Sequence, residues 1–518
     1  MGYVGQTYAI PFKNSGLNLD KNIDSIPPTG LVVARNVNLH EGGIGTRGGT
    51  TKDNTTAVTS SPDIRGLYYF RLISGTAFQV FGTSAGDLYK NTTTTIKTGM
   101  STTKKFWFET FEDTLYIVDG TTTPQTWNGV AAGTSAITTA SADWSGGDQP
   151  DQIIKHGRGN SERLWAKGVA NRPNGVDYSE LGNGGIFAGG TSGKITIETG
   201  DGFGITGLIE FGDTLFAFGK SQTYIIDDSN VNTVSWGYDP APWTGGVAHH
   251  RLLVKTDNDL FAMMEDGTIY SVTQAQFARD YKRASVTRPA FIDRYIRDNV
   301  LLSSIADFHA VYDPNIRAIY WFVVRINQTE CDTALVQFID RPPEQAWVIH
   351  DNQSSNSGYS AACSALIRVG SGDYEVWTGD YSGFLWRLNQ SNANDDSAAF
   401  YSGVKTPNAA LDNPRISKHF KRGRVVTEPK GTYSVNVNWW VDGVAQTART
   451  ISLAGTGSVF GTGTFGTATF GGEDLIDSSY EFGQYGKRLQ QEFYMNTVNQ
   501  EFFLSSNLID FKPMGVLP

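Results

Sequence analysis

The chain has 518 residues, a formal net charge of −10, 58 glycines and 12% aromatic residues. This acidic balance argues against a protein that grips nucleic-acid phosphates, because such proteins are basic. No apolar run approaches the roughly 18 residues of a membrane span, and no secretion signal opens the sequence, so we expect no span and folding in the cytoplasm of the producing cell. Two cysteines, Cys331 and Cys363, are too few for a disulfide framework and match no zinc spacing, so we expect both to pack in the core.

Residues 1–60 are polar and contain two turn-forming segments, Ile26–Gly30 and Gly42–Gly49. Such a stretch buries too little apolar surface to offset the entropy of ordering its backbone. We therefore predict an extended N-terminal arm that is ordered by docking on the rest of the chain or on a neighbouring subunit. In the first case, we expect the strand near Thr7–Ile10 to close the first sheet of the region that follows.

Residues 61–395 contain a phrase that recurs about every forty to fifty residues and consists of a short turn, an aromatic residue and a strand. A second phrase, an apolar pair ending in an aromatic residue, lies upstream of most copies, which indicates two antiparallel strands joined by a hairpin. The first phrase occurs at Gly86–Tyr89, Gln125–Gly129, Gly175–Tyr178, Ser221–Tyr224, Asp266–Tyr270, Gln345–Trp347 and Gly383–Trp386.

A unit of this length has room for four short strands, which is the size of one propeller blade. The repeats therefore predict an all-β fold with a β-propeller of about seven four-stranded blades in residues 61–395. A stack of β-hairpins or a large sandwich without ring closure is the alternative. We expect one insertion, between about Arg325 and Arg341, to explain the longest spacing, and we expect a connector with a helical turn or two within Gln274–Asp298.

Residues 396–518 differ from the repeats, because their apolar residues alternate strictly in segments such as Tyr433–Gly443 and Arg449–Leu453. Alternation of this kind is typical of half-buried strands. We predict a small C-terminal antiparallel β-sandwich that follows the propeller.

Two features of this C-terminal domain are candidate partner surfaces. The tract Gly457–Gly472 spaces Phe460, Phe465 and Phe470 five residues apart in flexible glycine and threonine, which favours an interaction loop over a disordered linker. A basic cluster opens the domain, and it is either a patch for an acidic partner or nucleic acid or a strand edge protected by charge. Its members are Arg415, Lys418, His419, Lys421, Arg422 and Arg424.

The sequence contains no constellation that predicts catalysis, a cofactor or a metal site. Ser141–Trp144 fails the spacing of the Asp-box of sialidase-like propellers, and the adjacent His249 and His250 would point to opposite faces of a strand. Carboxylates near strand ends could pair as acid and base in a glycosidase, but acidic turn residues are expected in any all-β chain. These carboxylates are Glu210, Asp213, Glu265 and Asp266.

Several segments resemble the tail nozzle or tail-hub stabilisation proteins of short-tailed bacteriophages, the group that contains the P22 tail-stabilisation protein. The resemblance covers most of the chain at the level of pattern and is weakest in the Phe/Gly tract. The segments that carry it are Phe12–Asn18, Ile26–Pro28, Ala34–Val37, Ile44–Gly48, Arg163–Gly168, Asn171–Glu180 and Asp257–Tyr270.

The resemblance implies a structural virion protein without enzymatic activity, made and folded in the host cytoplasm. It implies a homohexameric ring below the portal and its adaptor, or head-to-tail connector, that extends and closes the DNA-ejection channel and anchors fibres or spikes. Double-stranded DNA would pass through without sequence-specific binding. Two other classes stay open: a propeller glycan hydrolase or lyase of the sialidase-like type, and a non-viral protein-interaction propeller.

Overall fold

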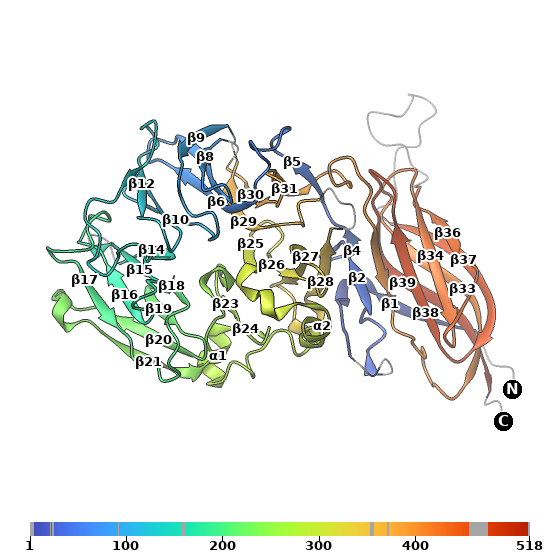
Figure 1. The fold of residues 1–518 in the computed structure, drawn as a ribbon. Coiled ribbons are helices and arrows are strands. Elements are labelled where there is room, and N and C mark those ends of the chain that lie inside the picture. The colour runs from blue at the N-terminus through green and yellow to red at the C-terminus, as the bar shows by residue number, and fades with distance from the viewer. Residues whose placement is uncertain are drawn as a thin grey trace.

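The computed structural model describes residues 5–20, 22, 25–91, 93–157, 161–352, 357–369, 372–454 and 475–515. In these residues the regular structure is almost entirely β-sheet, with two short α-helices, α1 (Val272–Ala278) and α2 (Ile292–Asn299), and a few 3₁₀ turns. Small sheets follow one another around a ring, in colour order from blue to orange, and an elongated β domain lies beside the ring (Figure 1).

The ring is a β-propeller, and its sheets are numbered here as blades in chain order. Blade 1 contains β6 (Ile64–Arg71), β7 (Ala77–Thr83), β8 (Leu88–Lys90) and β9 (Thr94–Lys97). Blade 2 contains β10 (Trp107–Phe111), β11 (Thr114–Val118), β12 (Gln125–Trp127) and β13 (Ser135–Ala136). Blade 3 contains β14 (Gln152–His156), β15 (Arg163–Lys167), β16 (Gly175–Tyr178) and β17 (Gly193–Thr196). Blade 4 contains β18 (Gly207–Phe211), β19 (Thr214–Phe218), β20 (Gln222–Asp227) and β21 (Gly237–Thr244).

The remaining blades complete the circle. Blade 5 contains β22 (Leu253–Lys255), β23 (Leu260–Met263) and β24 (Ile269–Ser271). Blade 6 contains β25 (His309–Asp313), β26 (Ala318–Val324), β27 (Cys331–Phe338) and β28 (Trp347–Asp351). Blade 7 contains β29 (Cys363–Arg368), β30 (Tyr374–Gly379), β31 (Leu385–Gln390) and, from the N-terminal region, β5 (Gly49–Lys52).

The ring closes. The innermost strand of each blade contacts the innermost strand of the next, and β29 of blade 7 contacts β6 of blade 1. Apolar clusters fill the spaces between neighbouring blades; Trp127 packs between blades 1 and 2, and Trp377 packs between blades 7 and 1. Cys363 is buried in the second of these clusters and Cys331 is buried in blade 6, and both thiols are free. Each blade thus covers the face of its neighbour, as stacked sheets require.

The recurring phrases correspond to defined strands in most blades. The upstream phrase marks the second strand, for example β11 and β19, and the main phrase marks the third strand, for example β12 and β20. Blade 6 differs, and the predicted insertion between Arg325 and Arg341 is wrong. That segment forms the third strand, β27, which is buried along its whole length, and the phrase at Gln345–Trp347 marks the fourth strand, β28.

Blade 5 has three strands in the described residues instead of the expected four. After β24 the chain enters helix α1, whose N-cap is Ser271, with a side-chain oxygen that accepts a hydrogen bond from the amide of Gln274. Helix α2 follows, and the connector reaches β25 through a 3₁₀ turn at Leu302–Asp307. The helical connector expected within Gln274–Asp298 is thus present, and it takes the place of a fourth strand.

The N-terminal region closes the propeller in a way that the sequence did not predict. The strand near Thr7–Ile10 does not join blade 1; as β1 (Gln6–Pro11) it pairs with β39 of the C-terminal domain. Closure falls instead to β5, whose Lys52 pairs with Trp386 and whose Thr51 pairs with Arg387 in blade 7. The expectation for Thr7–Ile10 is wrong because the sequence of a short strand does not show which distant strand it pairs with.

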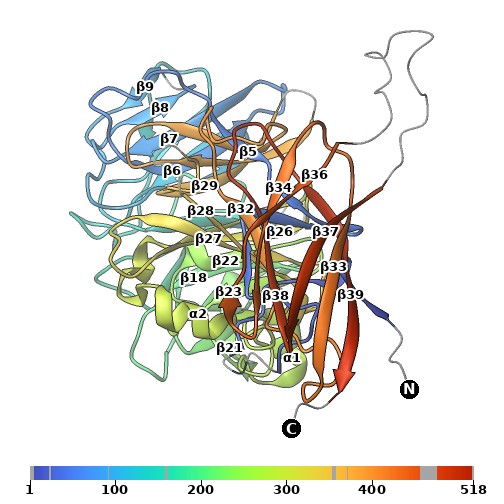
Figure 2. The ribbon, with the colours of Figure 1, turned by 90° about the vertical axis from the view of Figure 1, so that its right-hand side faces the viewer.

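The C-terminal domain is a sandwich of two sheets, and the N-terminal region contributes strands to both (Figure 2). Trp439 of one sheet packs on Phe482 of the other, with ring centroids 4.9 Å apart. One sheet contains β1, β3 (Val37–His40), β4 (Gly43–Thr46), β39 (Phe503–Gly515), β33 (Ser417–Thr427) and β37 (Ile476–Gly486). The other contains β2 (Val33–Arg35), β32 (Ser402–Lys405), β38 (Leu489–Met495), β34 (Ser434–Val441), β35 (Val444–Ala445) and β36 (Arg449–Ser452).

Strand β2 joins the two domains. It pairs in parallel with β28, the outer strand of blade 6, and antiparallel with β32 of the sandwich. Blade 6 and one layer of the sandwich are therefore a single continuous sheet of ten strands in the described residues. A shared sheet resists bending between domains more strongly than a linker does, because bending would break backbone hydrogen bonds.

A buried ion pair lies beside this junction. Arg47 and Asp395 have fully buried side chains and form two hydrogen bonds of 3.0 and 2.7 Å. The Nε of Arg47 donates to Asn36 at 3.0 Å, and its guanidinium carbon lies 4.5 Å from the ring centroid of Tyr359 and 3.8 Å from that of Phe400. The pair thus connects the N-terminal region to the segment that leaves blade 7.

Replacing Arg47 with methionine should leave the Asp395 carboxylate buried and unpaired, which costs about 3–5 kcal/mol of unfolding free energy. We expect a large decrease in the urea midpoint followed by tryptophan fluorescence. Arg422→Ala is the matched control, because its pair with Asp510 is half exposed and should be worth about 1 kcal/mol or less. Equal midpoints for the two variants would contradict the importance of the buried pair.

Gly49→Ala should open the closing strand of blade 7. A Cβ at Gly49 would collide with the backbone carbonyls of Asn392 and Asn394, and overpacking of this kind costs about 1–3 kcal/mol. The control is Gly237→Ala, also on an outer strand, where a Cβ has nothing within 4 Å. We expect a lower melting temperature by calorimetry for Gly49→Ala only.

Candidate functional site

The predicted basic cluster lies on β33 and the turn before it, and the structure divides its members. Lys418 is buried, and its Nζ donates to the carbonyls of Asn413 at 2.8 Å and Ile416 at 3.2 Å. Burial lowers the pKa of Lys418, while the charges of Asp412 and Asp442 oppose this change. Lys418 therefore fixes the turn that precedes β33 and is not available to a partner.

Some of the other cluster members form ion pairs within the domain, and others are exposed without such a partner. Arg422 forms an ion pair with Asp510, and Arg424 forms ion pairs with Asp477 and Asp510. The alternative of a charged strand edge is wrong, because β33 lies between β39 and β37 inside its sheet. The ring of His419 stacks on the ring of Tyr485, with the ring centroids 4.3 Å apart. Of the cluster's members, Arg415 and Lys421 are exposed and form no ion pair with other described residues.

Phe460, Phe465 and Phe470 lie outside the described residues. The segment that contains them connects β36 to β37. In the described residues, β37 is an outer strand of its sheet.

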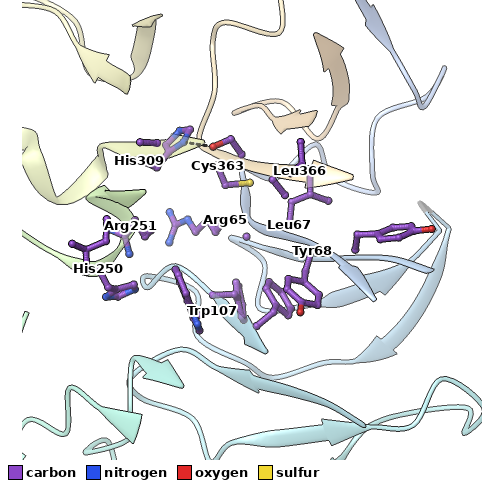
Figure 3. Close-up of a pocket in the computed structure, with 17 residues that line it drawn as sticks. Arg65, Leu67, Tyr68, Trp107, His250, Arg251, His309, Cys363 and Leu366 are labelled. Carbon is purple, nitrogen blue, oxygen red and sulfur yellow. Dashed lines mark hydrogen bonds between the residues drawn. The ribbon is translucent and has the colours of Figure 1, made fainter. Parts of the chain in front are cut away.

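A hollow lies where the innermost strands of the propeller converge (Figure 3). A cavity of about 400 Å³ is lined by the innermost strands of five blades, with Tyr68 and Trp107 on one side and Leu366 on another. A second cavity of about 480 Å³ shares Arg65, His250 and Arg251 with the first. It opens where the innermost strands begin, and we call it the axial mouth.

The axial mouth concentrates charge. Basic side chains from blades 1, 3 and 5 and from the segment before blade 2 line or border it: Arg65, Lys104, Lys105, Lys167 and Arg251. The carboxylates are Asp63, Asp119, Asp151 and Asp307. Asp119 is occupied by its own turn, since it accepts hydrogen bonds from the amides of Ser101, Thr121 and Thr122.

The histidines around the mouth are uncharged at neutral pH. Burial, together with the nearby positive charges, lowers the pKa of His249 and His250 well below the usual value, and the same holds for His309. His250 accepts a hydrogen bond from Lys167 at 3.1 Å, and His309 is fixed by Ser364 at 2.8 Å and by the carbonyl of Ala361 at 3.0 Å. They add hydrogen-bonding groups to the mouth without adding charge.

The carboxylates considered for glycoside hydrolysis have separate roles. Glu265 forms an ion pair with Lys220 at 2.6 Å, and Asp266 accepts a hydrogen bond from the amide of Thr268 in the turn before β24. Glu210 pairs with His156. In the part of the chain that the structure describes, no group of three or more His, Cys, Asp or Glu side chains is placed to hold a metal ion.

Sequence reasoning missed the basic residues of the mouth. Lys105 and Arg251 each lie just before an innermost strand, and Lys167 ends a second strand, so no local pattern joins them. A comparison of equivalent positions across the repeats would have been the only sequence signal.

His156 connects blades 3 and 4 at the other end of the innermost strands. It is 2% exposed, and its ring nitrogens lie 3.1 Å from Glu210 and 3.2 Å from Asp228. Burial opposes the charged form, but the hydrogen bonds and charges of Asp228 and Glu210 outweigh burial and raise the pKa of His156. The contact is therefore strongest when His156 is protonated.

This raised pKa predicts how stability changes with pH. The contribution of protonated His156 is fully present below its unfolded pKa of about 6.5 and is lost as the pH rises through the higher folded pKa. His156→Gln should lower the unfolding free energy by about 1–3 kcal/mol at pH 6 and by less at pH 9. His419→Gln is the control, because no carboxylate pairs with His419 in the described ranges. A deficit in His156→Gln that stays constant from pH 6 to 9 in calorimetry would refute the charged contact.

No family model and no curated protein sequence matches the chain. Solved structures that match include BBS1N in complex with ARL6DN, with a TM-score of 0.42, 9% identity and coverage of 68% of this chain and 100% of that one. YCF48 from Cyanidioschyzon merolae matches with a TM-score of 0.37, 10% identity and coverage of 66% and 98%. The Neurospora crassa Pan2 WD40 domain matches with a TM-score of 0.38, 9% identity and coverage of 67% and 96%. These similarities are low, and the propeller fold follows from the strand pairing and ring closure described above.

No helix in the described ranges is long and apolar enough to cross a lipid bilayer.

Proposed function

We propose that this protein is a structural subunit of the tail of a short-tailed bacteriophage. Six copies form a ring-shaped nozzle below the portal and its adaptor, extend and close the channel for DNA ejection, and anchor fibres or spikes. The function is mechanical, and the protein is not an enzyme.

The observation that carries this proposal is where the resembling segments lie. Ala34–Val37 and Ile44–Gly48 supply Asn36 and Arg47, which form the buried contacts at the junction between propeller and sandwich. Phe12–Asn18 is anchored in the same region, since Phe12 is fully buried and Leu17 donates a backbone hydrogen bond to Trp347. The resemblance therefore follows the residues that make two domains into one rigid unit.

A resembling segment inside the propeller has a similar role. Within Asn171–Glu180, Asp177 is buried and forms a short ion pair with Arg172 of the same segment. Asp177 also accepts a hydrogen bond from the indole of Trp144 at 3.0 Å. Rigidity of this kind suits a conduit that must keep its shape under load.

Charge and sheet edges support the same proposal. Six copies would carry six times the net charge of −10, so DNA would be repelled and would slide without adhering if the lumen shares this sign. In the described residues, β1 and β37 are unpaired on their outer sides, and open edges of this kind can accept strands of neighbouring subunits. Arg415 and Lys421 offer exposed charge to an acidic partner.

The test is the assembly state of the purified full-length chain, alone and mixed with adaptor rings of a short-tailed phage. We expect six-membered rings in negative stain and a matching mass by mass photometry. Arg415→Glu combined with Lys421→Glu should weaken adaptor binding by roughly tenfold, whereas Arg71→Glu, an exposed charge on the propeller, should not. A chain that stays monomeric under both conditions, or that cleaves a cell-surface glycan, would favour one of the other classes.

A further inference from the structure

Two cations of the axial mouth have no carboxylate within hydrogen-bond distance. Arg65 lies 3.1 Å from Asp63, and Lys167 lies 2.9 Å from Asp151, so these two cations have partners. Lys105 and Arg251 differ from them. Both line the mouth, one from the segment before blade 2 and the other from the turn before blade 5.

The ammonium group of Lys105 is hydrogen-bonded to backbone carbonyls, and no carboxylate lies within hydrogen-bond distance of it. Its Nζ donates to the carbonyls of Asp307 at 3.0 Å and Ala362 at 2.7 Å. The carboxylate of Asp307 is 3.9 Å away, too far for a hydrogen bond, and is half exposed. An ammonium group has three donors, and the described residues satisfy two of those of Lys105.

Arg251 has still fewer partners. Its guanidinium donates to the carbonyl of Ala306, and its Nε is buried without a hydrogen-bond partner in the described structure. No carboxylate forms an ion pair with it in the same residues. Figure 3 shows Arg251 and Arg65 extending into the middle of the ring of innermost strands.

The other groups around the mouth give these two cations no hydrogen-bonded negative charge, and the carboxylates of Asp151 and Asp307 act on them only through longer-range attraction. His249 and His250 are neutral, and Asp119 is used by its turn. Burial lowers the pKa of Lys105, and the charge of Arg251 lowers it further, so the two cations are close enough to repel one another. Buried charges in folded proteins are normally paired, and an unpaired donor in a hydrated hollow indicates a missing anion.

We propose that the axial mouth binds a phosphate-type oxyanion between Lys105 and Arg251. The guanidinium of Arg251 matches two oxygens of such a group, and Lys105 adds a point charge. The cavity of about 480 Å³ has room for a phosphate and for the first atoms of an ester. The anion is either free phosphate or a phosphate monoester on a small molecule. This inference does not depend on ring assembly.

The experiment measures the melting temperature of the full-length wild-type protein with three additives at equal ionic strength: inorganic phosphate, adenosine monophosphate and sodium chloride. Selective binding to the folded protein raises its stability, and an additive at a hundred or more times its dissociation constant should raise the melting temperature by about 2 °C or more. Equal ionic strength separates binding from charge screening. Free phosphate as the ligand predicts an increase with phosphate, and a monoester predicts a larger increase with adenosine monophosphate.

Arg251→Gln should abolish the increase. Arg71→Gln, which removes an exposed charge from the far end of β6, is the matched control and should retain it. If Arg251→Gln does not fold, Lys105→Gln and a direct titration of wild type with phosphate by calorimetry replace it. The proposal is overturned if neither phosphate compound exceeds sodium chloride, or if the increase persists in Arg251→Gln and in Lys105→Gln.

Discussion

The ion pair between Arg47 and Asp395 is the interaction on which the rest of the structure depends. Its members are 348 positions apart, and both side chains are fully buried. The chain passes this point twice, once as it leaves the sandwich for the closing strand β5 and once as it returns from blade 7. Closure of the propeller and attachment of the sandwich therefore share one contact. Removing either member of this buried ion pair would leave an unpaired buried charge and destabilise the fold.

Much of the fold could be predicted from the sequence because its signals are local. A turn followed by an aromatic residue identifies the third strand of most blades, and a hairpin phrase identifies the second. Strict alternation in Tyr433–Gly443 predicts β34 with its buried face, and the structure has that strand at Ser434–Val441. Propeller and sandwich follow from such patterns, since each depends on residues only a few positions apart.

The parts that could not be predicted depend on pairs that are distant in the chain. Nothing in Gly49–Lys52 indicates that it completes a blade formed hundreds of residues later, and nothing in Val33–Arg35 indicates that it joins two domains. The axial mouth has the same origin, because Lys105, Lys167 and Arg251 come from three blades. Lys418 shows a further limit, since a basic run does not reveal which of its members is buried.

The use of N-terminal strands to complete late sheets has a consequence for synthesis. A ribosome needs on the order of a minute to make a chain of this size, and during most of that time β2 and β5 lack the strands with which they pair. Blades 1 to 4 can form as they emerge, whereas the ring must wait for blade 7 and the sandwich must wait for the last strands, β38 and β39. Such long-range closure makes folding slow and leaves sheet edges open to aggregation, so the nascent chain is a natural client for chaperones.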